Sequence, residues 1–245
     1  MIALFLGPAP ADEAALRCAS LFEQSAGDPV LEVQILGALA FLEAIQGRLG
    51  DAGELIARAR TITRDLGEWV WSFSFDYATL CLWQGDPVAA DLEVRPGYEA
   101  LKKIGEKSHL SALAQVLAKA VYLQGRYDEA EQLTRECEEA ARPNNVESQI
   151  IWRSTRAKVL AHRGELEAAE RLGEEAVTIA GESDFLTAHA EALMDLAEVL
   201  QLAGRREGAE ARIQDAVRLF ELKRNVLGAD RARGRLAELQ DAAPR

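Results

Sequence analysis

Five similar turns at nearly equal intervals constrain the fold more than any other feature of this 245-residue sequence. In each turn an apolar stretch ends at a glycine, and an alanine and a second apolar stretch follow after a short polar gap. The glycines are Gly47, Gly85, Gly125, Gly164 and Gly204, so the intervals are 38, 40, 39 and 40 residues. Glycine suits the left-handed cap that ends a helix, and a period of this length is typical of stacked helical hairpins.

The residues on both sides of the third turn have helical periodicity. Apolar positions recur three or four residues apart, first at Leu113, Leu117 and Val121 and then at Tyr127, Ala130 and Leu133. The sequence therefore predicts an all-α chain, an α-solenoid of about five and a half hairpins with a period of about 39. We expect residues 1–245 to form a single superhelical domain that ends in a capping helix at about 225–240.

The repeat resembles the tetratricopeptide (TPR) consensus. Residues 125–130 give its Gly-x-Tyr-Asp-Glu-Ala turn, and the other four turns match it in part. The period exceeds the 34 residues of that consensus, so each hairpin needs longer helices or a longer loop. HEAT repeats have the longer period but lack this glycine-alanine turn, and they are the second choice.

The N-terminal end of the chain leads to an expectation of its own. The N-terminal residues indicate an array that begins in mid-repeat, as if it were part of a longer chain. Its first apolar residues, Leu4, Phe5 and Leu6, are then exposed at an open edge, which makes self-association through that edge an alternative role.

Composition excludes several classes of partner. A net charge of −12 opposes binding to nucleic acid or to an anionic membrane. No apolar run is long enough to span a bilayer, and no secretory leader is recognisable. The three cysteines, Cys18, Cys81 and Cys137, lie at apolar helical positions, which favours reduced packing residues in a cytoplasmic protein.

Three strings resemble the C-terminal repeat region of bacterial multidomain signalling proteins that combine an adenylate or guanylate cyclase with an AAA-type ATPase. They are RPGYEAL at 95–101, WR at 152–153 with RAKVLA at 156–161, and DLAEVL at 195–200. The resemblance implies a sensory or partner-binding arm attached to an upstream enzyme. The sequence itself has no Gly-x4-Gly-Lys-Ser/Thr loop and no recognisable cyclase aspartates.

No catalytic, metal or cofactor site is predicted. His109, His162 and His189 lack ligand spacing to cysteines or carboxylates, and the abundant acidic residues fit the solvated faces of amphipathic helices. We therefore expect no enzyme activity and no cofactor.

The first helices of such hairpins usually line the concave face, so the binding residues are expected there. The candidate groove contacts are Trp71, Phe75, Gln115, Lys119, Tyr122, Ser154 and Lys158. The aromatic run at 69–83 has two interpretations, packing against the neighbouring hairpin or an aromatic-lined binding surface. Arg153 and Arg156 also have two interpretations: they pair with glutamates of adjacent helices, or they form a candidate anion-binding site.

These features predict a non-catalytic protein–protein interaction module that binds a protein or peptide, or an upstream domain of the same polypeptide. It would then be the partner-binding arm of a larger signalling protein. The alternative is a small-molecule-sensing solenoid that regulates an upstream ATPase or cyclase domain.

Overall fold

The computed structural model describes residues 6–24, 27–65, 71–142 and 144–241, and over these residues the chain contains helices and no strands. Side chains at 71–73 and 108 lie outside the described part. The helices are α2 (Ala11–Gln24), α3 (Pro29–Ile45), α4 (Leu49–Asp65), α5 (Trp71–Trp83), α6 (Pro87–Ile104), α7 (Ser108–Leu123), α8 (Tyr127–Ala140), α9 (Val146–His162), α10 (Leu166–Gly181), α11 (Leu186–Leu202), α12 (Arg206–Lys223) and α13 (Val226–Asp241).

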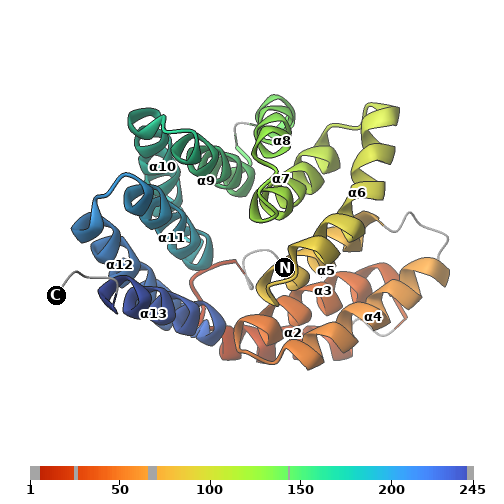
Figure 1. Cartoon of the computed structure of the whole chain (residues 1–245). Coiled ribbons are helices and arrows are strands. Elements are labelled where there is room, and N and C mark those ends of the chain that lie inside the picture. The colour runs from red at the N-terminus through yellow and green to blue at the C-terminus, as the bar shows by residue number, and fades with distance from the viewer. Residues whose placement is uncertain (1–5, 25–26, 66–70, 143, 242–245) are drawn as a thin grey trace.

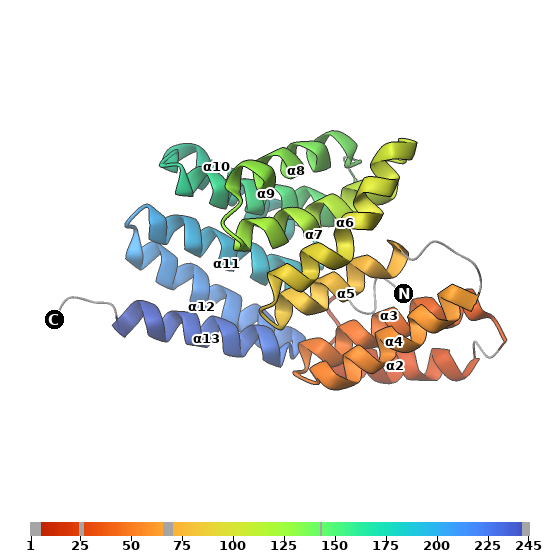
Figure 2. The ribbon, with the colours of Figure 1, turned by 45° about the vertical axis from the view of Figure 1, so that its right-hand side comes forward.

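The helices stack as successive antiparallel pairs that follow a curved path. Five pairs run from α3–α4 to α11–α12, with α2 before them and α13 after them (Figure 1). Each helix packs on the next, and the first helices also pack on one another, as α7 does on α5 and on α9. The view turned by 45° shows the same stack from the side (Figure 2). The all-α solenoid fold is confirmed.

A glycine with positive φ lies between the two helices of each pair. The five repeated glycines have φ values of +85°, +78°, +76°, +81° and +72° in chain order, a region that other residues rarely adopt. Side-chain caps start several helices. The Asp28 carboxylate accepts from the backbone N–H groups of Val30 and Leu31 at 3.1 Å, and the Asn145 amide oxygen accepts from Ser148 N–H at 3.2 Å.

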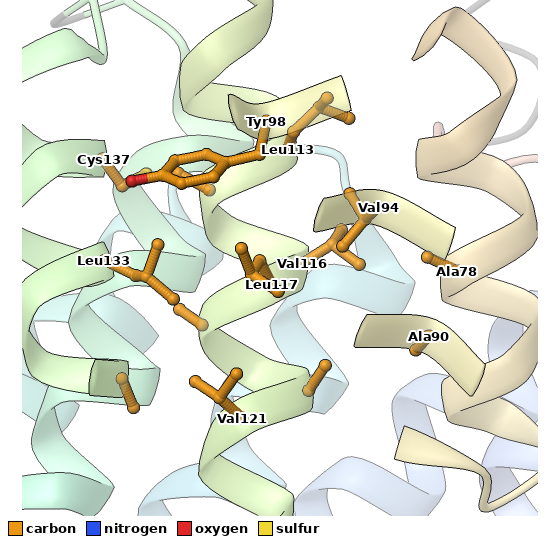
Figure 3. Close-up of a cluster of buried hydrophobic side chains, with 14 of the residues drawn as sticks. Ala78, Ala90, Val94, Tyr98, Leu113, Val116, Leu117, Val121, Leu133 and Cys137 are labelled. Carbon is orange, nitrogen blue, oxygen red and sulfur yellow. The ribbon is translucent and has the colours of Figure 1, made fainter. Parts of the chain in front are cut away.

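Helices of 13 to 18 residues are marginal alone, so the stability of the stack comes from the surfaces between them. The central cluster joins α5, α6, α7 and α8 through Ala78, Val94, Leu117 and Leu133, all at most 3% exposed (Figure 3). Cys137 lies in the same cluster, and Cys18 and Cys81 are also buried free thiols, as their apolar positions predict.

The capping helix packs very closely on the helix before it. Asn225 starts α13, because its side-chain oxygen accepts from Gly228 N–H at 2.7 Å. The Cα of Gly228 lies against the fully buried Phe220 ring of α12, and a Cβ at this position would come within 2.6 Å of that ring. The same helix has an open glycine, Gly234, with nothing near its Cβ position.

The curvature brings the two ends of the stack together. The Lys223 ammonium of α12 is fully buried and donates to the carbonyl oxygens of Gly7 and Ala9 at 2.6 and 2.8 Å. Arg224 forms an ion pair with Asp12 of α2, and α13 packs on α3. Figure 1 shows this meeting of the red and blue ends.

This closure overturns one expectation about the N-terminus. Leu6 is only 6% exposed and faces the interior of the curved stack, so it is not part of an open edge. The sequence could not show the closure of the stack, because the contacts of Lys223 with Gly7 and Ala9 join residues more than 210 positions apart. Leu4 and Phe5 lie outside the described residues.

Candidate functional site

The concave side of the stack contains a partly enclosed pocket of about 180 Å³. Its walls come mainly from the first helices of the five pairs, α3, α5, α7, α9 and α11, together with Ile56 of α4 and Leu6. This arrangement follows from the repeat, because each hairpin turns its first helix toward the inside of the curve.

The wall formed by α3, α4 and α5 is predominantly apolar. It includes Phe41, Phe75, Leu80 and Trp83, and the rings of Phe41 and Trp83 meet edge-on with centroids 5.1 Å apart. Such a wall suits an apolar side chain of a ligand.

The opposite wall presents polar groups that have no hydrogen-bond partner among the described residues. Gln115 of α7, Ser154 of α9 and Thr187 of α11 are 2%, 3% and 5% exposed, and all three line the pocket. Within the described part of the chain, Gln115 Oε1, Ser154 Oγ and Thr187 Oγ1 have no hydrogen-bond partner. Buried polar atoms normally have one, so these three call for polar groups inside the pocket.

Two carboxylic acids line the pocket, and no cation of the described residues forms an ion pair with either of them. Asp76 of α5 lies against the backbone of α3, where a Cβ at Gly37 would be 3.2 Å from Asp76 Oδ2, and Glu147 is in the first turn of α9. No hydrogen bond or ion pair to another described residue reaches either carboxyl group. Burial and the charge of Glu147 raise the pKa of Asp76 to about 7, and burial raises the pKa of Glu147 to about 7 as well.

A cluster of ion pairs lies between α7, α9, α11 and α13 and forms the floor of the pocket. Lys158 is 2% exposed, and its Nζ lies 2.7 Å from Asp195 Oδ1 and 3.6 Å from Glu198 Oε2. Burial alone would lower the pKa of Lys158, but the two carboxylates outweigh it and raise that pKa. The Tyr122 hydroxyl donates to Glu198, and Lys158 also lies over the Tyr122 ring.

Glu191 connects this floor to the pocket. It pairs with Arg231 of α13 and lies 3.7 Å from Lys119 Nζ. Burial by itself would raise the pKa of Glu191, but Arg231, Lys119 and Lys158 together lower it to about 2. Glu191 is therefore ionised and paired at neutral pH.

The structure places the candidate groove residues in two groups. Phe75, Gln115, Lys119 and Ser154 line the pocket. Tyr122 and Lys158 belong to the ion-pair floor beneath it and are almost fully buried. The Trp71 side chain lies outside the described residues.

The two arginines proposed as a candidate anion site have partners within the chain. Both guanidinium groups stack on the Trp152 ring, at 4.2 Å for Arg153 and 4.5 Å for Arg156. Arg153 pairs with Glu175 at 3.4 Å, and Arg156 pairs with Glu138 at 2.6 Å. These contacts are those of the first interpretation, pairing with glutamates of neighbouring helices.

The described ranges contain no group of three or more histidine, cysteine, aspartate or glutamate side chains that could hold a metal ion. None of the helices in these ranges has the length and apolar character needed to cross a membrane.

Comparison with known proteins supports the fold. No protein-family model matches the chain, and no curated protein matches its sequence. Among solved structures, NprR in complex with its cognate peptide NprX has a TM-score of 0.65 at 13% identity, over 94% of this chain and 65% of NprR. A thermophilic TPR protein of Thermus thermophilus has a TM-score of 0.55 at 19% identity, over 85% of this chain and 98% of that protein.

A third solved structure has the same fold. It is a signal transduction ATPase with numerous domains and a TPR sensor, from Pyrococcus horikoshii. The TM-score is 0.53 at 16% identity, over 94% of this chain and 37% of that protein. At these identities the likeness concerns the fold, and it defines the chain as a TPR-like α-solenoid.

Sequence reasoning missed several residues of the pocket. Asp76, Glu147 and Thr187 were not among the candidates, although each lies on a first helix. Asp76 interrupts the aromatic run between Phe75 and Tyr77, and a carboxylate inside an apolar run was the available signal.

Proposed function

We propose that this chain is a peptide-binding repeat module and that the concave pocket is the principal binding site. One observation carries the proposal: Gln115, Ser154 and Thr187 are buried side chains from three successive pairs, and their unpartnered polar atoms line one cavity. An extended peptide presents amide and carbonyl groups at regular intervals, so it can satisfy such a row.

The likeness in fold to NprR, a protein solved in complex with its cognate peptide NprX, supports this proposal. The proposal includes the remaining expectations: a single domain over residues 1–245, a cytoplasmic location, no catalysis, and no nucleic-acid or membrane partner. It also includes a place as the partner-binding arm of a larger signalling protein. The candidate anion site at Arg153 and Arg156 has no part in it.

The second candidate function is a small-molecule sensor that regulates an upstream ATPase or cyclase domain. The volume of about 180 Å³ favours it, because a partly enclosed cavity of this size suits a compact ligand better than several peptide residues. A screen by thermal shift against metabolites separates the two. A sensor gains thermal stability with a small molecule, whereas a peptide module gains it only with peptides.

The test of peptide binding uses two variants that remove unpartnered polar groups while keeping side-chain size. Peptides are selected from a random library on the full chain, and their affinities are measured by calorimetry for the wild type, Thr187→Val and Gln115→Met. We expect each variant to weaken binding about fivefold to tenfold, which corresponds to one hydrogen bond of about 1 kcal/mol. Neither variant should lower the melting temperature, because these atoms have no hydrogen-bond partner to lose within the described part of the chain.

Matched controls lie on outer helices. Thr178→Val on α10 and Gln132→Met on α8 change the same residue types at exposed positions and should leave affinity unchanged. Failure of the library to yield a binder, or equal affinities for pocket and control variants, would refute peptide binding at this site.

A further inference from the structure

The pocket also indicates what kind of chemical group it receives, and this inference rests on the proposed function. Its carboxyl groups come from α5, α9 and α11, at Asp76, Glu147, Glu191 and Asp195, whereas Lys119 is its one lysine or arginine among the described lining residues. Glu191 and Asp195 already have cationic partners, Arg231 and Lys158. Asp76 and Glu147 therefore remain as the unmatched acceptors.

The unmatched polar atoms are mostly hydrogen-bond acceptors. The two carboxyl groups and Gln115 Oε1 accept, and the hydroxyls of Ser154 and Thr187 can accept as well. A primary ammonium group offers three donors and no acceptor, which complements this set. An anionic group would instead add repulsion to a pocket that is already acidic.

The volume of the cavity limits the size of the apolar group that can bind together with the ammonium group. An apolar cavity of about 150 Å³ holds one benzene molecule. The pocket of about 180 Å³ therefore accommodates one aromatic or branched side chain next to the ammonium group, with Phe41, Phe75 and Trp83 around it. Further residues of a peptide have to extend out of the opening.

We propose that the pocket binds a primary ammonium group attached to one apolar side chain, as found at the N-terminal residue of a peptide, with Asp76 and Glu147 as its counter-ions. The raised pKa of both carboxyl groups agrees with this assignment, since neither has a cationic partner among the described residues and each would ionise when a cation arrives. Lys119 faces the same space, and its pairing with Glu191 moderates its repulsion of the ligand.

The experiment measures binding of defined probes to the full chain at pH 7.5 by calorimetry. Two small probes, 2-phenylethylamine and 2-phenylethanol, have the same ring and differ in the charged group. Two peptides, Phe-Ala-Ala-amide and its N-acetylated form, separate a peptide N-terminus from a free amine. The charged member of each pair should bind at least about tenfold more tightly, as a charge-assisted hydrogen bond to a carboxylate requires.

Asp76→Asn and Glu147→Gln should each remove most of that preference. Glu54→Gln, a change at an exposed carboxylate of α4, is the matched control and should retain it. Equal binding of charged and neutral probes, or no effect of the two pocket variants, would overturn the ammonium assignment.

The outcomes also separate this inference from the proposed function. Peptides that bind through Thr187 and Gln115 without preference for a free N-terminus would leave peptide binding intact and overturn the ammonium assignment. Binding of 2-phenylethylamine without binding of either peptide would support the ammonium site and contradict the peptide function.

Discussion

Lys158 and Lys119 were expected to play the same part in a binding groove, and the structure predicts very different consequences when each is replaced by methionine. Lys158 is 2% exposed and is the cation that Asp195 contacts at 2.7 Å. Removing one member of a buried ion pair costs about 3–5 kcal/mol, because the remaining charge stays buried without a partner. The carboxylates of Asp195 and Glu198 are 17% and 32% exposed, so the low end, about 3 kcal/mol, applies.

Lys119→Met is the control. The Lys119 side chain is 26% exposed, its Nζ is 3.7 Å from Glu191, and Glu191 keeps Arg231 when the lysine is lost. The expected loss is at most about 1 kcal/mol, as for a solvated pair.

Urea denaturation followed by circular dichroism measures both losses. In thermal unfolding, a loss of about 3 kcal/mol lowers the melting temperature by about 6–12 °C for a chain of this size. A second change, Asp195→Asn, in the Lys158→Met background should recover part of the stability, since it removes one of the stranded charges. If both lysine variants lose the same stability, the ion-pair floor is not the structural element described above.

Three further predictions concern the cap, the pocket and the closure. Gly228→Ala should lose about 1–3 kcal/mol by overpacking, whereas Gly234→Ala in the same helix should gain about 0.5–1 kcal/mol in urea denaturation; equal shifts would contradict the close packing. The pKa values of Asp76 and Glu147 are raised to about 7 in the folded state, so that state binds more protons than the unfolded state between about pH 4 and pH 7. The stability contributed by these two groups therefore falls as pH rises through this window. Asp76→Asn should reduce the fall in urea midpoint between pH 5 and pH 8, and an unchanged fall would exclude Asp76 as its source. Lys223→Met should speed hydrogen exchange in α2 and leave α8 unaffected; no change in α2 would show that the ammonium does not hold the ends together.

The fold could be predicted because its information is local and repeated. Each repeated glycine reports a helix end by itself, and regular spacing is enough to give the stacking of pairs. The concave face followed from the same repeat, and Phe75, Gln115, Lys119 and Ser154 lie on the first helices that line the pocket.

The side-chain contacts in and around the pocket were less predictable than the fold, because they depend on the distances between successive pairs of helices. Tyr122 and Lys158 have suitable positions on first helices, but the sequence does not show that Asp195 and Glu198, on a helix of a later pair, bury and pair them. Likewise, nothing local in the sequence indicates that Lys223 meets the N-terminal segment. Curvature sets these contacts, and it is the sum of many small rotations between repeats.

The most direct test of the central claim maps where a bound peptide lies. A peptide selected on the full chain, with a photoreactive group on its first residue, is cross-linked to the protein, and the modified positions are identified by mass spectrometry. Cross-links on the pocket-facing residues of α5, α7, α9 and α11 are the predicted result. Cross-links confined to the outer helices α8, α10 and α12 would contradict the account.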